Sequence, residues 1–136
     1  MKDMMETVYI ADDEANIREG LKCIIDWEEL GFKVCGEAGN GEDALQDILR
    51  LNPSLVLIDM RMPKLYGLEV IEQAKGQGFA GAFVILSGYS DFKYAQTAMK
   101  FGVKYYLTKP MDEEELEKVV KEVYNDIQGE RQKKRR

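Results

Sequence analysis

A short apolar run that ends in an aspartate restricts the fold more than any other feature of this sequence. Leu55–Ile58 is apolar at every position, too short for a helix and rich in strand-forming residues. Such a run is typical of a central parallel strand that helices cover on both faces. Asp59 follows at the carboxyl end, and Pro63 ends the strand. Because open α/β sheets place their chemistry at the carboxyl ends of their strands, Asp59 is the first candidate site residue.

Strand and helix patterns alternate along the rest of the chain. Four more strands are predicted, at residues 7–11, 32–38, 82–86 and 103–108. Helices are predicted at residues 15–26, 42–51, 67–77, 92–102 and 113–127, with Ser90 or Asp91 capping the fourth and Asp112 the fifth. This alternation with short connections predicts an α/β fold, a doubly wound parallel sheet with helices on both faces.

The composition excludes several classes of function. The 136 residues suffice for one domain, and 45% hydrophobic with 32% charged residues is typical of a folded globular protein. The absence of histidine excludes Ser-His and Cys-His nucleophiles, His-bearing zinc sites and a phosphohistidine carrier. No apolar run approaches a membrane span and the first residues lack a signal-peptide core, so we expect a cytoplasmic location without membrane contact. Cys23 and Cys35 are expected to be small half-buried side chains, not a disulfide or metal site.

Charge is distributed unevenly along the chain. The net charge is −6, although residues 129–136 carry five positive charges and one negative charge. The acidic remainder argues against direct nucleic-acid binding, because phosphate contacts require Lys and Arg. We therefore predict a domain at residues 5–127 and a basic tail at residues 128–136. The tail is too short to form a DNA-binding fold.

Charged and polar residues follow the predicted strands at the edge where the carboxyl ends meet. Asp12 and Asp13 follow the first strand, Asp59 the third, Ser87 the fourth and Lys109 the fifth, whereas the second contributes only a Gly-Asn-Gly turn. If the first strand lies beside the third, three carboxylates converge, and they need a shared proton or a divalent cation. Mg²⁺ suits oxygen ligands. One carboxylate would then act as a nucleophile toward phosphorus, with the metal and the lysine neutralising phosphoryl oxygens.

Each of these residues also has an ordinary structural explanation. The acidic residues at 12–14 suit the positive end of a helix dipole, and Asp59 suits a strand-end cap. Ser87 could be a turn residue, Lys109 a surface lysine, and Tyr106 a half-buried aromatic residue at an edge. The structural explanations would have to hold for all of these residues at once, which favours a joint functional role.

The sequence resembles the receiver domains of two-component response regulators over about residues 5–127. The resemblance is carried by Asp12-Asp13, by Asp59 in Leu-Ile-Asp-Met-Arg-Met-Pro, by Ser87-Gly88, by Tyr106 and by Lys109-Pro110. It implies a flavodoxin-like, five-stranded sheet in the order 2-1-3-4-5 with five helices. It also implies a phosphorylation-activated signalling switch that is not an enzyme in the turnover sense.

The resemblance assigns roles to the residues of the acidic cluster. Asp59 would accept the phosphoryl group from a sensor histidine kinase. Asp13, Asp59 and the backbone carbonyl of Arg61 would bind Mg²⁺ directly, and Asp12 would bind it through water.

The resemblance also implies a switch mechanism. Lys109 would pair with the phosphoryl group, and its bond to Pro110 is expected to be cis. The Ser87 hydroxyl would move to a phosphoryl oxygen, and Tyr106 would turn inward into the vacated space. This would repack the face formed by the fourth helix, fifth strand and fifth helix.

Two bulky residues are predicted to slow self-dephosphorylation. Arg61 and Tyr89 stand two residues after the expected phosphoacceptor and two after the switch hydroxyl. In the resembled family these positions flank the path of the attacking water. The alternative is that both side chains simply point into solvent.

A narrower resemblance concerns the stretches Ile17–Leu21, Ile25–Phe32 and Ser87–Ala95. They are similar to receivers attached to AraC-type DNA-binding output domains. This implies contact with DNA only through an output domain absent from this chain, with residues 128–136 as the start of a linker or an ordinary polar terminus. A homodimer through the predicted switch face is a further expectation, based on Tyr105 and Tyr106 pointing to opposite faces.

Three other classes fit less well. Phosphatases with an aspartyl-phosphate intermediate use an Asp-x-Asp motif after the first strand, where this chain has Asp12-Asp13. Flavodoxin-like cofactor binders need a phosphate loop there, and acidic residues would repel phosphate. A receiver that acts only as an interaction module would not need the complete set of site residues.

Overall fold

Five parallel strands form the centre of the molecule. The structure is a computed structural model, and it describes residues 5–88 and 92–135. Its strands are β1 (Glu6–Ala11), β2 (Phe32–Ala38), β3 (Leu55–Asp59), β4 (Ala82–Ser87) and β5 (Tyr105–Thr108). Its helices are α1 (Ala15–Cys23), α2 (Gly41–Leu51), α3 (Gly67–Gly76), α4 (Phe92–Met99) and α5 (Glu113–Arg135). The strand order is β2-β1-β3-β4-β5, so the predicted fold class and strand order are confirmed.

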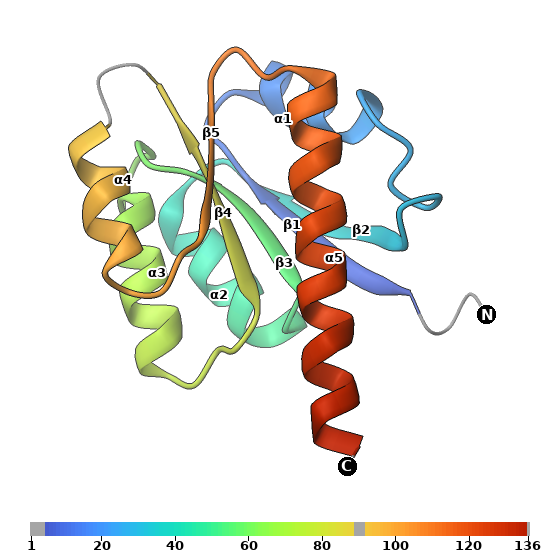
Figure 1. Ribbon diagram of the computed structural model, residues 1–136. Helices are drawn as coiled ribbons and strands as arrows, with labels where there is room; N and C mark the ends of the chain where they lie inside the picture. The colour runs from blue at the N-terminus through green and yellow to red at the C-terminus, as the bar shows by residue number, and fades with distance from the viewer. Residues whose placement is uncertain (1–4, 89–91, 136) are drawn as a thin grey trace.

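Two apolar cores lie on opposite faces of the sheet. Helices α1 and α5 cover one face, and α2, α3 and α4 cover the other (Figure 1). Successive residues of a strand point to opposite faces, so Val56 and Ile58 enter one core while Leu55 and Leu57 enter the other. All five residues of β3 are buried, as the unbroken apolar run predicts.

The register of the sheet brings together the residues that follow the strands. Ala11 of β1 pairs with Ile58 of β3, so Asp12 and Asp59 stand next to each other where the two strands end. On the other side of β3, Asp59 pairs with Leu86, and Ser87 pairs with Thr108 of β5. The site residues therefore lie on neighbouring strands at one edge of the sheet.

Three elements, α1, α4 and β5, are shorter than predicted by two or three residues, and α4 ends at Met99 rather than Gly102. Helix α1 ends at Cys23 rather than Asp26, because the Trp27 indole donates to the Leu21 carbonyl at 2.8 Å and a turn follows. Strand β5 begins at Tyr105 rather than Val103, because the turn that ends α4 continues to Gly102, whose φ is +89°. The predicted N-caps of α4 lie outside the described residues.

The free cysteines differ in their exposure. Cys35 is half-buried as predicted, whereas Cys23 is exposed at the end of α1.

Helix α5 is longer than the apolar periodicity predicts. Its apolar side ends near Ile127, but the helix continues to Arg135 through the residues that the sequence assigns to a basic tail. None of the helices in residues 5–88 and 92–135 is both long and apolar enough to cross a membrane. The role of residues 128–136 as the start of a linker stays a prediction.

A buried carboxylate holds this extension against the sheet. Glu6, the first residue of β1, is only 4% exposed and accepts hydrogen bonds from three side chains. Arg131 Nε donates at 2.7 Å, Gln128 Nε2 at 2.9 Å and Ser54 Oγ at 2.6 Å. Burial alone would raise the pKa of Glu6, but the hydrogen bonds from Arg131 and Ser54 outweigh it and hold the pKa below 4.5.

We expect Arg131→Ala to lower the free energy of unfolding by about 1 kcal/mol at pH 7, since it leaves a buried carboxylate with fewer donors. The folded-state pKa of Glu6 is depressed, so the stabilisation is complete above pH 4.5 and is lost as the pH falls through the lower folded value. Urea unfolding at several pH values measures both effects. Lys133→Ala, an exposed residue of the same helix, is the charge-matched control. An equal loss in both variants, or a loss independent of pH, would contradict the assignment.

Candidate functional site

The ends of β1, β3 and β5 bring two buried carboxylates and one ammonium group together. Lys109 Nζ lies 2.8 Å from Asp12 Oδ2 and 3.5 Å from Asp59 Oδ2. Asp12 is fully buried and Asp59 is 3% exposed, while Lys109 is half-buried. The Lys109–Pro110 peptide bond is cis, as the resemblance implies. The predicted meeting of Asp12, Asp59 and Lys109 is therefore present.

A third carboxylate completes the cluster. Asp12, Asp13 and Asp59 each offer one oxygen, and these oxygens all lie within 4.8 Å of one another. Asp13 is exposed, so the cluster is open to solvent on one side. Three carboxylate oxygens at such distances suit a hard divalent cation, and Mg²⁺ accepts a few carboxylates while it keeps several waters. The residues present are therefore suitable ligands for Mg²⁺, the cation expected from the sequence.

The pKa shifts in the cluster show that it carries buried negative charge that a cation would offset. Burial, followed by the neighbouring charge of Asp12, raises the pKa of Asp59 to about 7, although Lys109 opposes the shift. Burial disfavours the charge of Lys109, but its bond to Asp12 and the charge of Asp59 outweigh burial and raise its pKa. The single ammonium group therefore compensates the buried negative charge only in part.

The loop after β3 turns back onto Asp59. Met60 and Met62 are 1% and 3% exposed, whereas Arg61 between them is exposed. The Arg61 backbone N–H lies 3.4 Å from Asp59 Oδ1, which keeps the Arg61 peptide next to the carboxylate. Gly67 N–H donates to the Met60 carbonyl at 3.0 Å. A Cβ atom at Gly67 would lie 2.3 Å from the Asp59 carbonyl oxygen, so only glycine permits this close approach.

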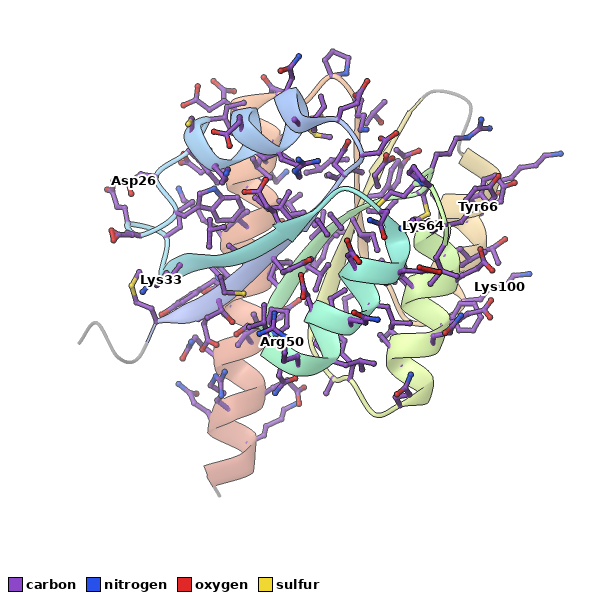
Figure 2. The ribbon with its side chains drawn as sticks, turned by 180° about the vertical axis from the view of Figure 1, so that it is seen from behind. Asp26, Lys33, Arg50, Lys64, Tyr66 and Lys100 are labelled. Atoms are coloured by element: carbon purple, nitrogen blue, oxygen red, sulfur yellow. The ribbon has the colours of Figure 1, made fainter. Side chains whose placement is uncertain are left out.

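The same loop carries two of the residues labelled in Figure 2. Lys64 has a φ of +71°, and Tyr66 precedes α3, where its N–H donates to Glu69 Oε1 at 3.1 Å. The Tyr66 ring packs edge-on against Tyr94 of α4, with the ring centroids 6.0 Å apart. The loop next to Asp59 is thereby in contact with α4.

The predicted switch residues lie on β4 and β5, and they do not contact Asp59 through any hydrogen bond between described residues. Ser87 is 4% exposed, and its hydroxyl donates to the Gly88 carbonyl at 3.0 Å. Tyr106 lies beside Ile85 in the sheet and is 40% exposed. This outward Tyr106 is the arrangement that the resemblance implies before phosphorylation. Tyr89 lies outside the described residues.

Sequence reasoning missed Arg18 and Glu37. Only a glycine-rich turn was expected to contribute at the end of the second strand, yet Glu37 at that end pairs with Arg18 of α1 at 2.7 Å. Arg18 Nη1 also donates to the Asp12 backbone carbonyl at 2.7 Å. The sequence signal that could have revealed this pair was Glu37 itself, an acidic residue near the carboxyl end of the strand that lies beside the first.

Comparison with known proteins gives a consistent result. A family model described as the response regulator receiver domain matches residues 8–121. The transcriptional regulatory protein YesN of Bacillus subtilis, described as uncharacterized, is 38% identical over 123 residues, which are 90% of this chain and 33% of that protein. The transcriptional regulatory protein HptR of Staphylococcus aureus is 38% identical over 116 residues, 85% of this chain and 45% of that protein. This chain therefore spans a third to less than half of these curated relatives.

Solved structures agree in fold and sequence. The REC domain of AraT, a response regulator from Geobacillus stearothermophilus, superposes with a TM-score of 0.90 and 38% identity, covering 94% of this chain and 99% of that one. A two component transcriptional regulator AraC from Clostridium phytofermentans superposes with a TM-score of 0.83 and 31% identity, covering 91% and 96%. The match of the family model, these relatives and the shared fold show that the chain belongs to the response regulator receiver domain family.

Proposed function

We propose that Asp59 accepts a phosphoryl group from the phosphohistidine of a sensor kinase and that the modified domain controls transcription. The observation that carries this proposal is the cluster of Asp12, Asp13 and Asp59 with Lys109 at the mouth of a parallel sheet. In a cytoplasmic two-component system, the domain would act on DNA through an output domain. The names of YesN and HptR, both transcriptional regulatory proteins, support this readout.

The chain's own residues would perform the transfer. An Asp59 carboxylate oxygen attacks phosphorus, the bond from phosphorus to the histidine nitrogen breaks, and an acyl phosphate forms on Asp59. Lys109, already 3.5 Å from Asp59 Oδ2, would move onto a phosphoryl oxygen. Asp12, Asp13, Asp59 and the Arg61 carbonyl would hold Mg²⁺, which when bound neutralises developing negative charge on the phosphoryl oxygens. Receiver domains are signalling switches, so no turnover of a separate substrate is proposed.

Phosphorylation would change the face formed by α4, β5 and α5. The Ser87 hydroxyl would exchange its bond to the Gly88 carbonyl for one to a phosphoryl oxygen, and Tyr106 would turn inward. Among the large hydrophobic side chains exposed on these elements are Met99 at the end of α4, Phe101 just after it and Tyr106 of β5. These exposed apolar side chains support a homodimer interface that involves α4 and β5.

We expect the wild-type chain to gain one phosphoryl group when it is incubated with acetyl phosphate and Mg²⁺, and to gain none without Mg²⁺. Asp59→Asn should gain none under either condition, because an amide is no nucleophile toward phosphorus. Intact-mass spectrometry measures the addition, and Asp26→Asn, an exposed aspartate in the turn after α1, is the matched control. If the wild-type chain gains no phosphoryl group, the proposal is wrong, and the remaining interpretation is a receiver that acts only as an interaction module.

We expect Mg²⁺ to stabilise the folded chain through Asp13. At a Mg²⁺ concentration about 100 times the dissociation constant, a site present only in the folded state adds about 2.7 kcal/mol to the free energy of unfolding. Asp13→Asn should lose most of this gain, since Asp13 is exposed and its substitution leaves the core intact. Thermal unfolding with and without Mg²⁺ measures this gain in stability, and Asp43→Asn on α2 is the control. An equal gain in both variants would exclude Asp13 as a ligand.

We expect Arg61→Ala and Tyr89→Ala each to shorten the lifetime of the acyl phosphate several-fold, because smaller side chains would admit the attacking water. The loss of the phosphoryl group after removal of acetyl phosphate, followed by intact mass, measures this lifetime. Lys64→Ala in the same loop as Arg61 is the control. Unchanged lifetimes in both variants would mean that the two side chains point into solvent, as the simpler alternative holds.

A further inference from the structure

Hydrogen bonds fix the backbone immediately before and immediately after the peptide that joins Asp12 to Asp13. The Asp12 N–H donates to the Ala38 carbonyl of β2 at 3.1 Å, and the Glu14 N–H donates to Asp12 Oδ1 at 2.9 Å. The Asp12 carbonyl oxygen, which belongs to the peptide leading into Asp13, accepts from Arg18 Nη1 at 2.7 Å. Arg18 is thus the side chain that fixes the orientation of this peptide.

Arg18 is itself held in place. Its Nε donates to Glu37 Oε1 at 2.7 Å, so one guanidinium group joins the ends of β1 and β2. Its side chain is only 20% exposed. A Cβ atom at Gly39 would lie 3.1 Å from Arg18 Nη1, so the glycine after β2 leaves room for the guanidinium. A planar group bound at two points loses little freedom when it forms each bond.

The position of the Asp13 carboxylate depends on the orientation of this peptide more than the positions of the Asp12 and Asp59 carboxylates do. Asp12 and Asp59 are buried and paired with Lys109, whereas the exposed Asp13 side chain makes no hydrogen bond or ion pair with the described residues. Nothing but its backbone therefore directs the Asp13 carboxylate toward the other two.

We propose that Arg18 is a positioning residue of the metal site: by holding the Asp12 carbonyl, it directs the Asp13 carboxylate toward the cation. This inference rests on the proposed function, because it concerns the same Mg²⁺ site. Arg18 binds the Asp12 carbonyl and the Glu37 carboxylate, so we expect it to act on the cation only through the backbone that carries Asp13. Outer-shell partners of this kind commonly contribute a factor of about 10 or more to metal affinity.

Charge alone predicts the opposite effect, which makes the proposal testable. Arg18 is a cation near the site, so its removal would strengthen Mg²⁺ binding if only long-range electrostatics mattered. Loss of the bond to the Asp12 carbonyl would weaken binding. Arg18→Lys separates the two effects, because it keeps the charge but cannot form both bonds with the geometry of a guanidinium group.

The experiment is isothermal titration of the wild type, Arg18→Gln, Arg18→Lys and Lys22→Gln with Mg²⁺. Lys22 is the matched control, because it also pairs with Glu37 and has no bond to the Asp12 carbonyl. We expect both Arg18 variants to bind Mg²⁺ about 10-fold more weakly, and Lys22→Gln to bind as the wild type or slightly more tightly. Tighter binding in Arg18→Gln with unchanged binding in Arg18→Lys would overturn the proposal.

A second measurement separates positioning from general damage. Phosphorylation by acetyl phosphate, followed over a range of Mg²⁺ concentrations, should need about 10-fold more Mg²⁺ in the Arg18 variants but reach the wild-type rate at saturation. A lower rate at saturating Mg²⁺ would indicate damage to the site rather than a loss of positioning. A wild type that binds no Mg²⁺ would overturn the proposed function, whereas a wild type that binds while both Arg18 variants match it would overturn only the role of Arg18.

Discussion

The structure depends on the burial of two carboxylates side by side. Asp12 and Asp59 meet because β1 and β3 are neighbours, and a single ammonium group, that of Lys109, lies between them. Their mutual repulsion and loss of hydration disfavour this arrangement, and the raised pKa of Asp59 is the direct consequence. A fold that maintains such a cluster favours whatever brings positive charge to it, and a divalent cation does this most effectively.

The parallel sheet makes this cluster possible because the residues that stabilise the fold and the residues of the site occupy different parts of the sheet. The two apolar cores lie along the strands and hold β3 buried over its full length. The site residues stand at the carboxyl ends of the strands or just beyond them, where the backbone leaves the sheet. Even the loop that returns toward Asp59 buries Met60 and Met62 while Arg61 remains exposed, so the apolar packing continues up to the site.

Most of the fold could be predicted, because short apolar runs and helical periodicity are local properties of the sequence. The residues Asp12, Asp13, Asp59 and Lys109 could be placed together from their positions after the strands once the first strand was taken to lie beside the third, an order that the receiver resemblance implied. Element ends were harder, since α1 stops where the Trp27 indole binds a backbone carbonyl, a contact that no periodicity encodes. Arg18 and Glu37 were missed because each is an ordinary polar residue of its own element, and their significance lies in a contact between two elements. The extension of α5 was missed for the same reason, since a buried carboxylate at the other end of the chain holds it.

The contacts of β1 suggest which part of the molecule is free to respond to the site. An arginine of α5 binds Glu6 at the start of β1, and an arginine of α1 binds the Asp12 carbonyl just after its end. The strand that carries the acidic residues is thus held at both ends by helices that lie on the same face of the sheet. On the opposite side of β3, the Ser87 hydroxyl bonds to the carbonyl of the next residue, Gly88, and Tyr106 is exposed. If Asp59 is phosphorylated as proposed, we therefore expect the structural response to run not toward β1 but toward β4 and β5, where α4 and β5 expose Met99 and Tyr106.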